Sequence, residues 1–106
     1  MTDAGGTDAR LVRRYTVTGR VQGIGFRWFV RERARALDLA GIVRNVVDGS
    51  VVVDVAGTAV QIQRLEDALA CGPRGAQVDG VAVLSMDGTT LDATRNALPY
   101  PFAIER

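Results

Sequence analysis

The sequence predicts an α+β fold in which an antiparallel sheet carries two helices on one face. Segments rich in β-branched residues alternate with segments of helical periodicity, and glycine-containing turns separate them. Their order reads strand, helix, strand, strand, helix, strand, which is the split βαβ arrangement, βαββαβ. With 106 residues, the chain is long enough for one domain with one modest core.

The first third of the chain is predicted to form a strand, a loop and a helix. Residues 11–18 are rich in β-branched and aromatic side chains, which is typical of a strand. Residues 19–25 contain three glycines in seven positions, which predicts a loop with unusual backbone angles. Apolar residues then recur at helical spacing, and we expect Gly41 to end this helix. These apolar residues are Phe26, Phe29, Val30, Ala34 and Leu37.

A β-hairpin and a second helix are expected next. Residues 42–47 and 50–56 have the composition of strands, and the Asp48-Gly49 pair between them is a strong signal for a tight turn. Thr58 and Gln61 have the spacing of a capping box, which begins a helix. The apolar stripe of this helix is formed by Ile62, Leu65 and Leu69, and Gly72 followed by Pro73 ends the helix.

In the C-terminal third, the residue pattern predicts a fourth strand over residues 78–84 and a long loop over residues 86–99. A short extra strand follows, in which apolar residues alternate at Tyr100, Phe102 and Ile104. Together the elements predict a ferredoxin-like split βαβ sandwich. We expect residues 1–10 to be a flexible tail and residues 11–106 to form the folded domain.

The amino-acid composition excludes several kinds of catalytic and metal-binding site. All thirteen basic residues are arginine, and the chain has no histidine and one cysteine, Cys71. These counts exclude a Schiff-base lysine, a histidine general base, an internal disulfide and a cysteine-rich zinc site. A net charge of +1 argues against a dedicated duplex-binding protein. No apolar run approaches the roughly 20 residues that cross a bilayer, and the polar N-terminus does not resemble a signal peptide, so we expect a soluble cytoplasmic protein.

The glycine-rich loop and the start of the first helix form one candidate site. Successive N–H groups of such a loop can converge on an anion, and the helix N-terminus adds unsatisfied donors and the positive end of its dipole. Arg27 lies in the first helical turn, where its planar guanidinium can bind two oxygens of a phosphate-sized anion. Taken separately, such a loop is more often a tight connection and such an arginine a solvated residue. The combination favours anion binding.

Asn45 is the second candidate. Asparagine is disfavoured inside strands, so we expect this residue to have either a structural hydrogen-bond partner or a functional role. Strand alternation places it on the same face as Val43 and Val47. On this feature alone, a hydrogen bond from an edge strand to a nearby loop explains the residue equally well.

Two segments together resemble the acylphosphatase family. The first is Gly19-Arg20-Val21-Gln22-Gly23-Ile24-Gly25-Phe26-Arg27. The second is Gly41-Ile42-Val43-Arg44-Asn45, followed by Asp48-Gly49-Ser50-Val51. They occur in the order and at the separation found in that family, and the resemblance covers about residues 15–83 plus the last strand.

The resemblance implies an enzyme without metal or cofactor that hydrolyses the carboxyl–phosphate bond of acyl phosphates. It implies that Arg27 binds the phosphate and that Asn45 positions the attacking water. The backbone amides that would assist Arg27 belong to Val21, Gln22, Gly23, Ile24, Gly25 and Phe26. The conjugate acid of a carboxylate leaving group has a pKa of only about 4, so a chain without histidine or lysine can manage this reaction. We expect a small-molecule acyl phosphate as substrate, inorganic phosphate as product and inhibitor, and a monomer.

Two other functions stay open from the sequence. A binding or regulatory module of the same fold would keep the phosphate site without useful turnover, and related domains occur in larger maturation proteins that handle carbamoyl phosphate. RNA-recognition modules share the architecture, but they stack bases on aromatic residues clustered across the sheet. Here Phe26 and Phe29 lie at core positions of a helix, and Trp28 is expected to be partly core or at a rim. We therefore expect no nucleic-acid partner.

Overall fold

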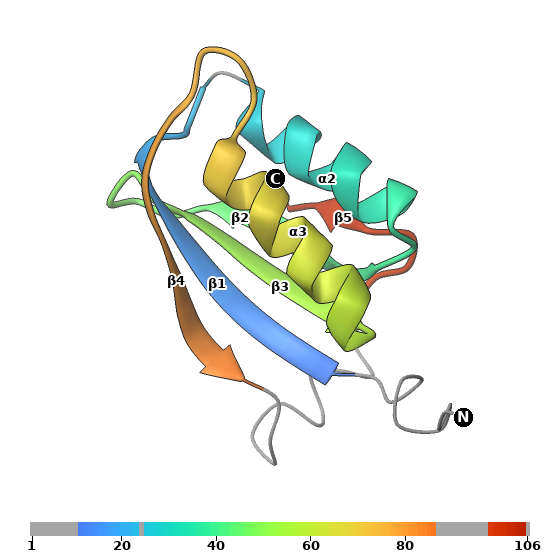
Figure 1. The fold of residues 1–106 in the computed structure, drawn as a ribbon. Helices are drawn as coiled ribbons and strands as arrows, with labels where there is room; N and C mark the ends of the chain where they lie inside the picture. The colour runs from blue at the N-terminus through green and yellow to red at the C-terminus, as the bar shows by residue number, and fades with distance from the viewer. Residues whose placement is uncertain (1–10, 24, 87–97, 106) are drawn as a thin grey trace, which may run out of the picture.

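The computed structural model of the chain describes residues 11–23, 25–86 and 98–105, in which two helices pack on one face of a five-stranded sheet (Figure 1). In chain order the elements are β1 (Leu11–Arg20), α2 (Phe26–Ala36), β2 (Ala40–Asn45), β3 (Val51–Gly57), α3 (Ala59–Cys71), β4 (Gln77–Met86) and β5 (Ala103–Ile104). This order confirms the predicted ferredoxin-like fold with an extra C-terminal strand. The expected tail and most of the expected loop over residues 86–99 lie outside the described residues.

The order of strands across the sheet is β4-β1-β3-β2-β5. Neighbours among the four long strands are antiparallel, as predicted, whereas β5 runs parallel to β2. Because β1 and β2 are both antiparallel to β3, they run in the same direction. Val51 of β3 pairs with Val17 of β1 on one side and with Asn45 of β2 on the other. The C-terminal ends of β1 and β2 therefore lie at the same end of the sheet.

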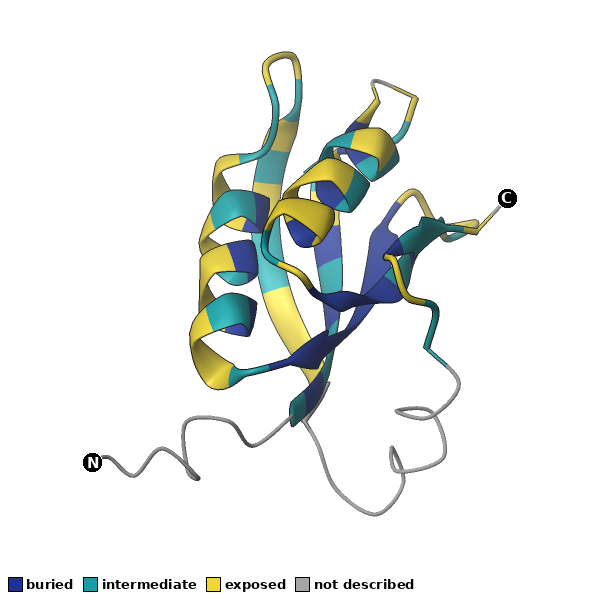
Figure 2. Cartoon of the chain, turned by 90° about the vertical axis from the view of Figure 1, so that its right-hand side faces the viewer, coloured by how far each residue is buried: buried dark blue, intermediate teal, exposed yellow. Residues whose placement is uncertain are grey.

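One hydrophobic core fills the space between the sheet and the helices. Figure 2 shows buried residues on the side of each helix that faces the sheet. As the periodicity predicted, each helix buries one stripe, formed by Phe26, Val30 and Ala34 of α2 and by Ile62, Leu65 and Leu69 of α3. Phe29 and Leu37, which were expected in the first stripe, are only partly buried. β3 is buried along its whole length, because it lies between β1 and β2 and beneath the helices.

The first helix ends earlier than predicted. α2 stops at Ala36, and the N–H of Leu39 donates to the carbonyl of Ala34 at 2.9 Å, which is the closing bond of a Schellman motif. Asp38 takes the left-handed position of this motif with a φ of 61°. The prediction that Gly41 ends the helix is therefore wrong. Aspartate is among the few non-glycine residues that tolerate this backbone conformation.

Gly41 lies inside β2 instead, where it makes room for a residue from the far end of the chain. Its φ is 149°, and a Cβ there would lie 2.1 Å from the carbonyl oxygen of Asp54 and 2.7 Å from the ring of Phe102. β2 consequently begins and ends two residues earlier than predicted. β1 and β4 are longer than predicted, so Gly19 and Arg20 belong to a strand rather than to the loop.

The predicted hairpin turn and helix cap are both present. Asp48 accepts hydrogen bonds from the hydroxyl of Ser50 at 2.6 Å and from its N–H at 2.9 Å, and these bonds lower the pKa of Asp48. At the start of α3, the hydroxyl of Thr58 accepts from the N–H of Gln61 at 3.3 Å. The side-chain oxygen of Gln61 accepts in return from the N–H of Thr58 at 2.8 Å, which completes the capping box.

Polar side chains of β1 link this strand to its neighbours across the sheet and the core. The guanidinium of Arg14 donates two hydrogen bonds to the carboxylate of Asp54, at 2.5 and 2.8 Å, and so ties β1 to β3. This contact raises the pKa of Arg14. The buried Tyr15 donates its hydroxyl to the carboxylate of Glu66 at 2.8 Å and so ties β1 to α3.

The buried phenol predicts a loss of stability at high pH. Burial is the main cause that raises the pKa of Tyr15 to about 12, and the hydrogen bond to Glu66 adds to it. The unfolded chain releases this proton near pH 10, whereas the folded protein keeps it to about pH 12. Between these pH values the folded state binds more protons than the unfolded chain. The contribution of Tyr15 to the free energy of unfolding is therefore complete below about pH 10 and is lost as the pH rises toward 12.

We expect urea unfolding measured between about pH 9 and pH 12 to show this decline in the native protein and to show a shallower one in Tyr15→Phe. Glu66→Gln should keep most of the decline, because burial rather than the carboxylate is the larger cause. Equal slopes in the native protein and Tyr15→Phe would contradict the assignment.

Candidate active site

The loop between β1 and α2 presents backbone donors at a helix N-terminus. Gly23 and Gly25 have φ angles of 77° and 79°, and no described atom lies within 4 Å of where a Cβ would be. The backbone angle, rather than crowding, therefore favours glycine at both positions. Gly25 is the N-cap of α2, and none of the described side chains caps this end. The first-turn N–H groups have no intrahelical acceptor, and the helix dipole adds partial positive charge. Ile24 lies outside the described residues.

Arg27 lies in the first turn of α2 and is held by the C-terminal segment. Its Nη1 donates to the carbonyl of Glu105 at 3.1 Å. The N–H of Glu105 donates in turn to the carbonyl of Val43 in β2, at 2.9 Å. Two turns further along α2, the Nε of Arg35 donates to the carbonyl of Phe102 at 2.8 Å. Helix α2 thus binds the C-terminal segment at two points, and this contact sets the direction of the Arg27 guanidinium.

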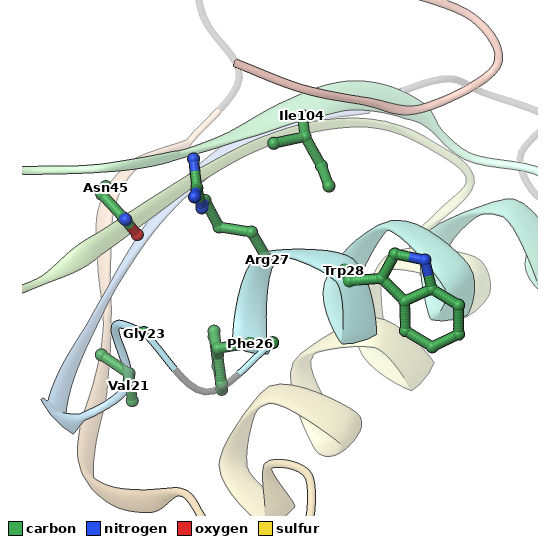
Figure 3. A pocket seen from close by; sticks show the side chains of 8 residues that line it. Val21, Gly23, Phe26, Arg27, Trp28, Asn45 and Ile104 are labelled. Atoms are coloured by element: carbon green, nitrogen blue, oxygen red, sulfur yellow. The ribbon is translucent and has the colours of Figure 1, made fainter. Parts of the chain in front are cut away.

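Asn45 is the last residue of β2, at the end of the strand rather than within it. By alternation it shares a face with the buried Val43, but it is exposed. Figure 3 shows the Arg27 side chain extending toward Asn45 across the cavity. The sheet register therefore brings together two polar residues that are far apart in the sequence.

Gln22 braces the loop against the β2–β3 hairpin. Its side-chain Nε2 donates to the carbonyl of Val46 at 2.7 Å and to that of Ser50 at 2.8 Å. From the sequence, Gln22 was predicted to contribute only its backbone amide. Its side chain fixes the distance between the loop, which carries the N–H donors, and the strand end that carries Asn45.

These segments line a cavity of about 390 Å³ that is open to solvent (Figure 3). It lies between the loop with the first turn of α2, the end of β2 and the strand β5. Its lining residues are Val21, Gly23, Gly25, Phe26, Arg27, Trp28, Asn45 and Ile104. Arg27 and Asn45 thus share one cavity with four of the loop positions singled out from the sequence.

Three residues at the cavity were not singled out as site residues from the sequence. Trp28 lines the cavity at its rim and is 57% exposed. Ile104 lines it from β5, and Glu105 holds Arg27. Alternation predicted a strand around Ile104, but no local signal says that this strand lies beside β2.

The cavity is suited to an anion that also has an apolar part. Arg27 and the helix N-terminus supply positive charge and N–H donors, and Asn45 supplies an amide oxygen that can accept from water. The described residues contain no cluster of three or more His, Cys, Asp or Glu that could hold a metal ion. None of the described helices is long and apolar enough to cross a membrane.

A family model and the curated relatives point to one family. The family model described as Acylphosphatase matches residues 13–93. An acylphosphatase from Koribacter versatilis is 49% identical over 81 residues, which cover 76% of this chain and 74% of the relative. One from Bifidobacterium longum is 48% identical over 79 residues, which cover 74% of this chain and 81% of the relative.

A solved structure supports the same conclusion. The crystal structure of an acylphosphatase from Bacillus subtilis superposes with a TM-score of 0.79 at 32% identity, covering 91% of this chain and 99% of that one. The family match spans both the glycine-rich loop and the strand that ends at Asn45. The fold, the sequence match and the relatives together establish that this chain belongs to the acylphosphatase family.

Proposed function

We propose that this acylphosphatase-family enzyme hydrolyses the carboxyl–phosphate anhydride bond of acyl phosphates, giving a carboxylate and inorganic phosphate, without a metal ion. One observation carries the proposal: Arg27, Asn45 and a helix N-terminus that no described side chain caps share one cavity. A phosphoryl group between them would meet a cation and N–H donors, and a water molecule beside it would meet the amide oxygen of Asn45. Phosphoryl transfer depends mainly on such placement and charge stabilisation.

Arg27 and the loop bind the phosphoryl group in this mechanism. The guanidinium presents five N–H donors in a planar fork, and the described contact to Glu105 uses one of its nitrogens. The fork can therefore bind two phosphoryl oxygens at once. The backbone amides of residues 21–26, Ile24 included, complete the cradle and stabilise the charge that spreads over the oxygens in the transition state.

Asn45 positions the nucleophile. Its amide oxygen accepts a hydrogen bond from a water molecule and directs the water oxygen at phosphorus. The bond from the water oxygen to phosphorus forms as the bond from phosphorus to the acyl oxygen breaks. The water proton passes to a phosphoryl oxygen, and the carboxylate leaves unprotonated because its conjugate acid has a pKa of about 4. No residue has to act as a general acid or base.

We propose that residues 11–106 form the catalytic unit and act as a monomer in the cytoplasm on a small-molecule substrate, with inorganic phosphate as product and inhibitor. The net charge of +1 gives no support for a nucleic-acid or membrane-surface partner.

The decisive experiment is hydrolysis of benzoyl phosphate in EDTA by the native protein and by Asn45→Ala. We expect turnover that EDTA does not change. In the variant we expect kcat to fall by about 100-fold or more, because the water loses its acceptor. Inhibition by inorganic phosphate should stay within about twofold, since Asn45 does not bind the phosphate. Turnover that survives in the variant would reject the role of Asn45, and phosphate binding without native turnover would favour a non-catalytic module.

Arg27→Ala should lose both binding and catalysis. We expect kcat/KM to fall by about 1,000-fold and inhibition by phosphate to weaken, because the charge is missing from both ground and transition states. Arg27→Lys should recover little, since a point charge cannot bind two oxygens. Arg33→Ala on the exposed face of the same helix is the control and should keep native activity. Near-native kcat/KM in Arg27→Ala would contradict the phosphate-binding role.

Gln22→Ala tests the brace between the loop and the hairpin. Its removal leaves the Val46 and Ser50 carbonyls without the Gln22 donor, so we expect a loss of about 1–2 kcal/mol in the free energy of unfolding. We also expect kcat/KM to fall by about tenfold, because the loop amides and Asn45 are no longer held at a fixed separation. Gln63→Ala, an exposed glutamine on α3, should change neither quantity. A native kcat/KM in Gln22→Ala would show that the loop needs no brace.

A further inference from the structure

Trp28 exposes a large apolar surface at the rim of the cavity. It is 57% exposed, although tryptophan is highly buried on average in folded proteins. One turn further along α2, the guanidinium of Arg31 lies 5.8 Å from the centre of the indole ring. Arg31 also pairs with Glu32 at 3.0 Å, which offsets its charge. The indole is therefore oriented by its neighbour without belonging to the hydrophobic core.

In-line phosphoryl transfer determines on which side of the phosphorus the acyl group lies. The attacking and leaving oxygens stand on opposite sides of the phosphorus. If Asn45 holds the water, the carboxylate must leave away from Asn45. Figure 3 shows the Arg27 side chain between Asn45 on one side and Trp28 on the other, with Ile104 also on the side away from Asn45. Trp28 and Ile104 are therefore the lining residues on the side where the leaving group would lie.

The lining of the cavity agrees with this direction. Its volume of about 390 Å³ is within the range of small-molecule sites. The apolar side chains of Trp28 and Ile104 lie on the side away from Asn45, whereas the apolar Val21 and Phe26 line the cavity from the loop and the start of α2, below Arg27. An aromatic or branched aliphatic group can pack on the indole face, whereas an acetyl group offers one methyl and gains little there.

We infer that Trp28 is a specificity-determining residue and that the preferred substrates are acyl phosphates with an aromatic or branched aliphatic acyl group. The inference rests on the proposed function, because it uses Asn45 to define the side from which water attacks. The competing class, acyl groups that carry a carboxylate, would use the charge of Arg31 instead. The pairing of Arg31 with Glu32 favours the apolar class.

The first test compares kcat/KM for benzoyl, acetyl and succinyl phosphate. The native enzyme should prefer benzoyl phosphate. Trp28→Ala should lower kcat/KM for benzoyl phosphate by about tenfold, which corresponds to about 1.4 kcal/mol, and that for acetyl phosphate by less than about twofold. Trp28→Phe should retain most of the preference, because it keeps a flat apolar ring.

Controls separate the acyl side from the phosphate side. Inhibition by inorganic phosphate should be the same in the native enzyme and Trp28→Ala. Val60→Ala, which truncates a comparably exposed apolar residue on α3, should leave all three substrates unchanged. Equal losses for benzoyl and acetyl phosphate in Trp28→Ala, or a native preference for succinyl phosphate, would overturn the inference.

The second test needs no turnover. Trp28 is the one tryptophan of the chain, so its fluorescence reports on this wall of the cavity alone. Saturation with isovalerylphosphonate, which has a carbon–phosphorus bond that water does not hydrolyse, should shield Trp28 from quenching by acrylamide. Inorganic phosphate should not shield it.

This design distinguishes failure of the inference from failure of the proposed function. If the native protein hydrolyses no acyl phosphate but the phosphonate shields Trp28, the proposed function fails and the acyl-binding role stands. If hydrolysis proceeds and the phosphonate binds without shielding Trp28, the inference fails alone. Absence of phosphonate binding by calorimetry would overturn the inference whatever the turnover.

Discussion

The candidate site depends on one constraint of the sheet: β1 and β2 lie on either side of β3 and run in the same direction. Because Val51 pairs with both Val17 and Asn45, the end of β2 is level with the last part of β1. The loop that follows β1 and the side chain that ends β2 must then meet. A one-residue slip of either strand would turn its side chains to the other face of the sheet and remove Asn45 from the cavity.

The C-terminal segment is a structural part of the site as well as of the core. Phe102 is fully buried and packs against Gly41, where β2 has no side chain in the way. From that anchor the chain runs parallel to β2, and its carbonyls accept hydrogen bonds from Arg35 and Arg27. The core contact thus places the segment, and the segment places the guanidinium. In this way the packing of an aromatic ring contributes to the orientation of a charged group at the cavity.

Local patterns could be read from the sequence where the physical cause was local. The capping box of Thr58 and Gln61 and the turn at Asp48 use hydrogen bonds between residues two or three positions apart, and both were predicted. The end of α2 was mispredicted because Asp38 takes the left-handed position that glycine usually fills. The role of Gly41 was missed because its reason, the ring of Phe102, comes from sixty-one residues further along the chain.

The sequence by itself determined the order of the elements, the hydrophobic stripes of both helices and the two polar residues, Arg27 and Asn45, most worth examining. These follow from periodicity, turn chemistry and motif spacing, which act over short stretches of chain. Only the tertiary structure decided that β5 runs parallel to β2, that Glu105 directs Arg27 and that Gln22 braces the loop. It also decided that Trp28 and Ile104 line the cavity on the side away from Asn45. Each of these features rests on contacts between segments that are distant in the sequence. Hydrophobic packing is not directional, so it does not specify which segments become neighbours. The register and topology of the whole sheet determine that.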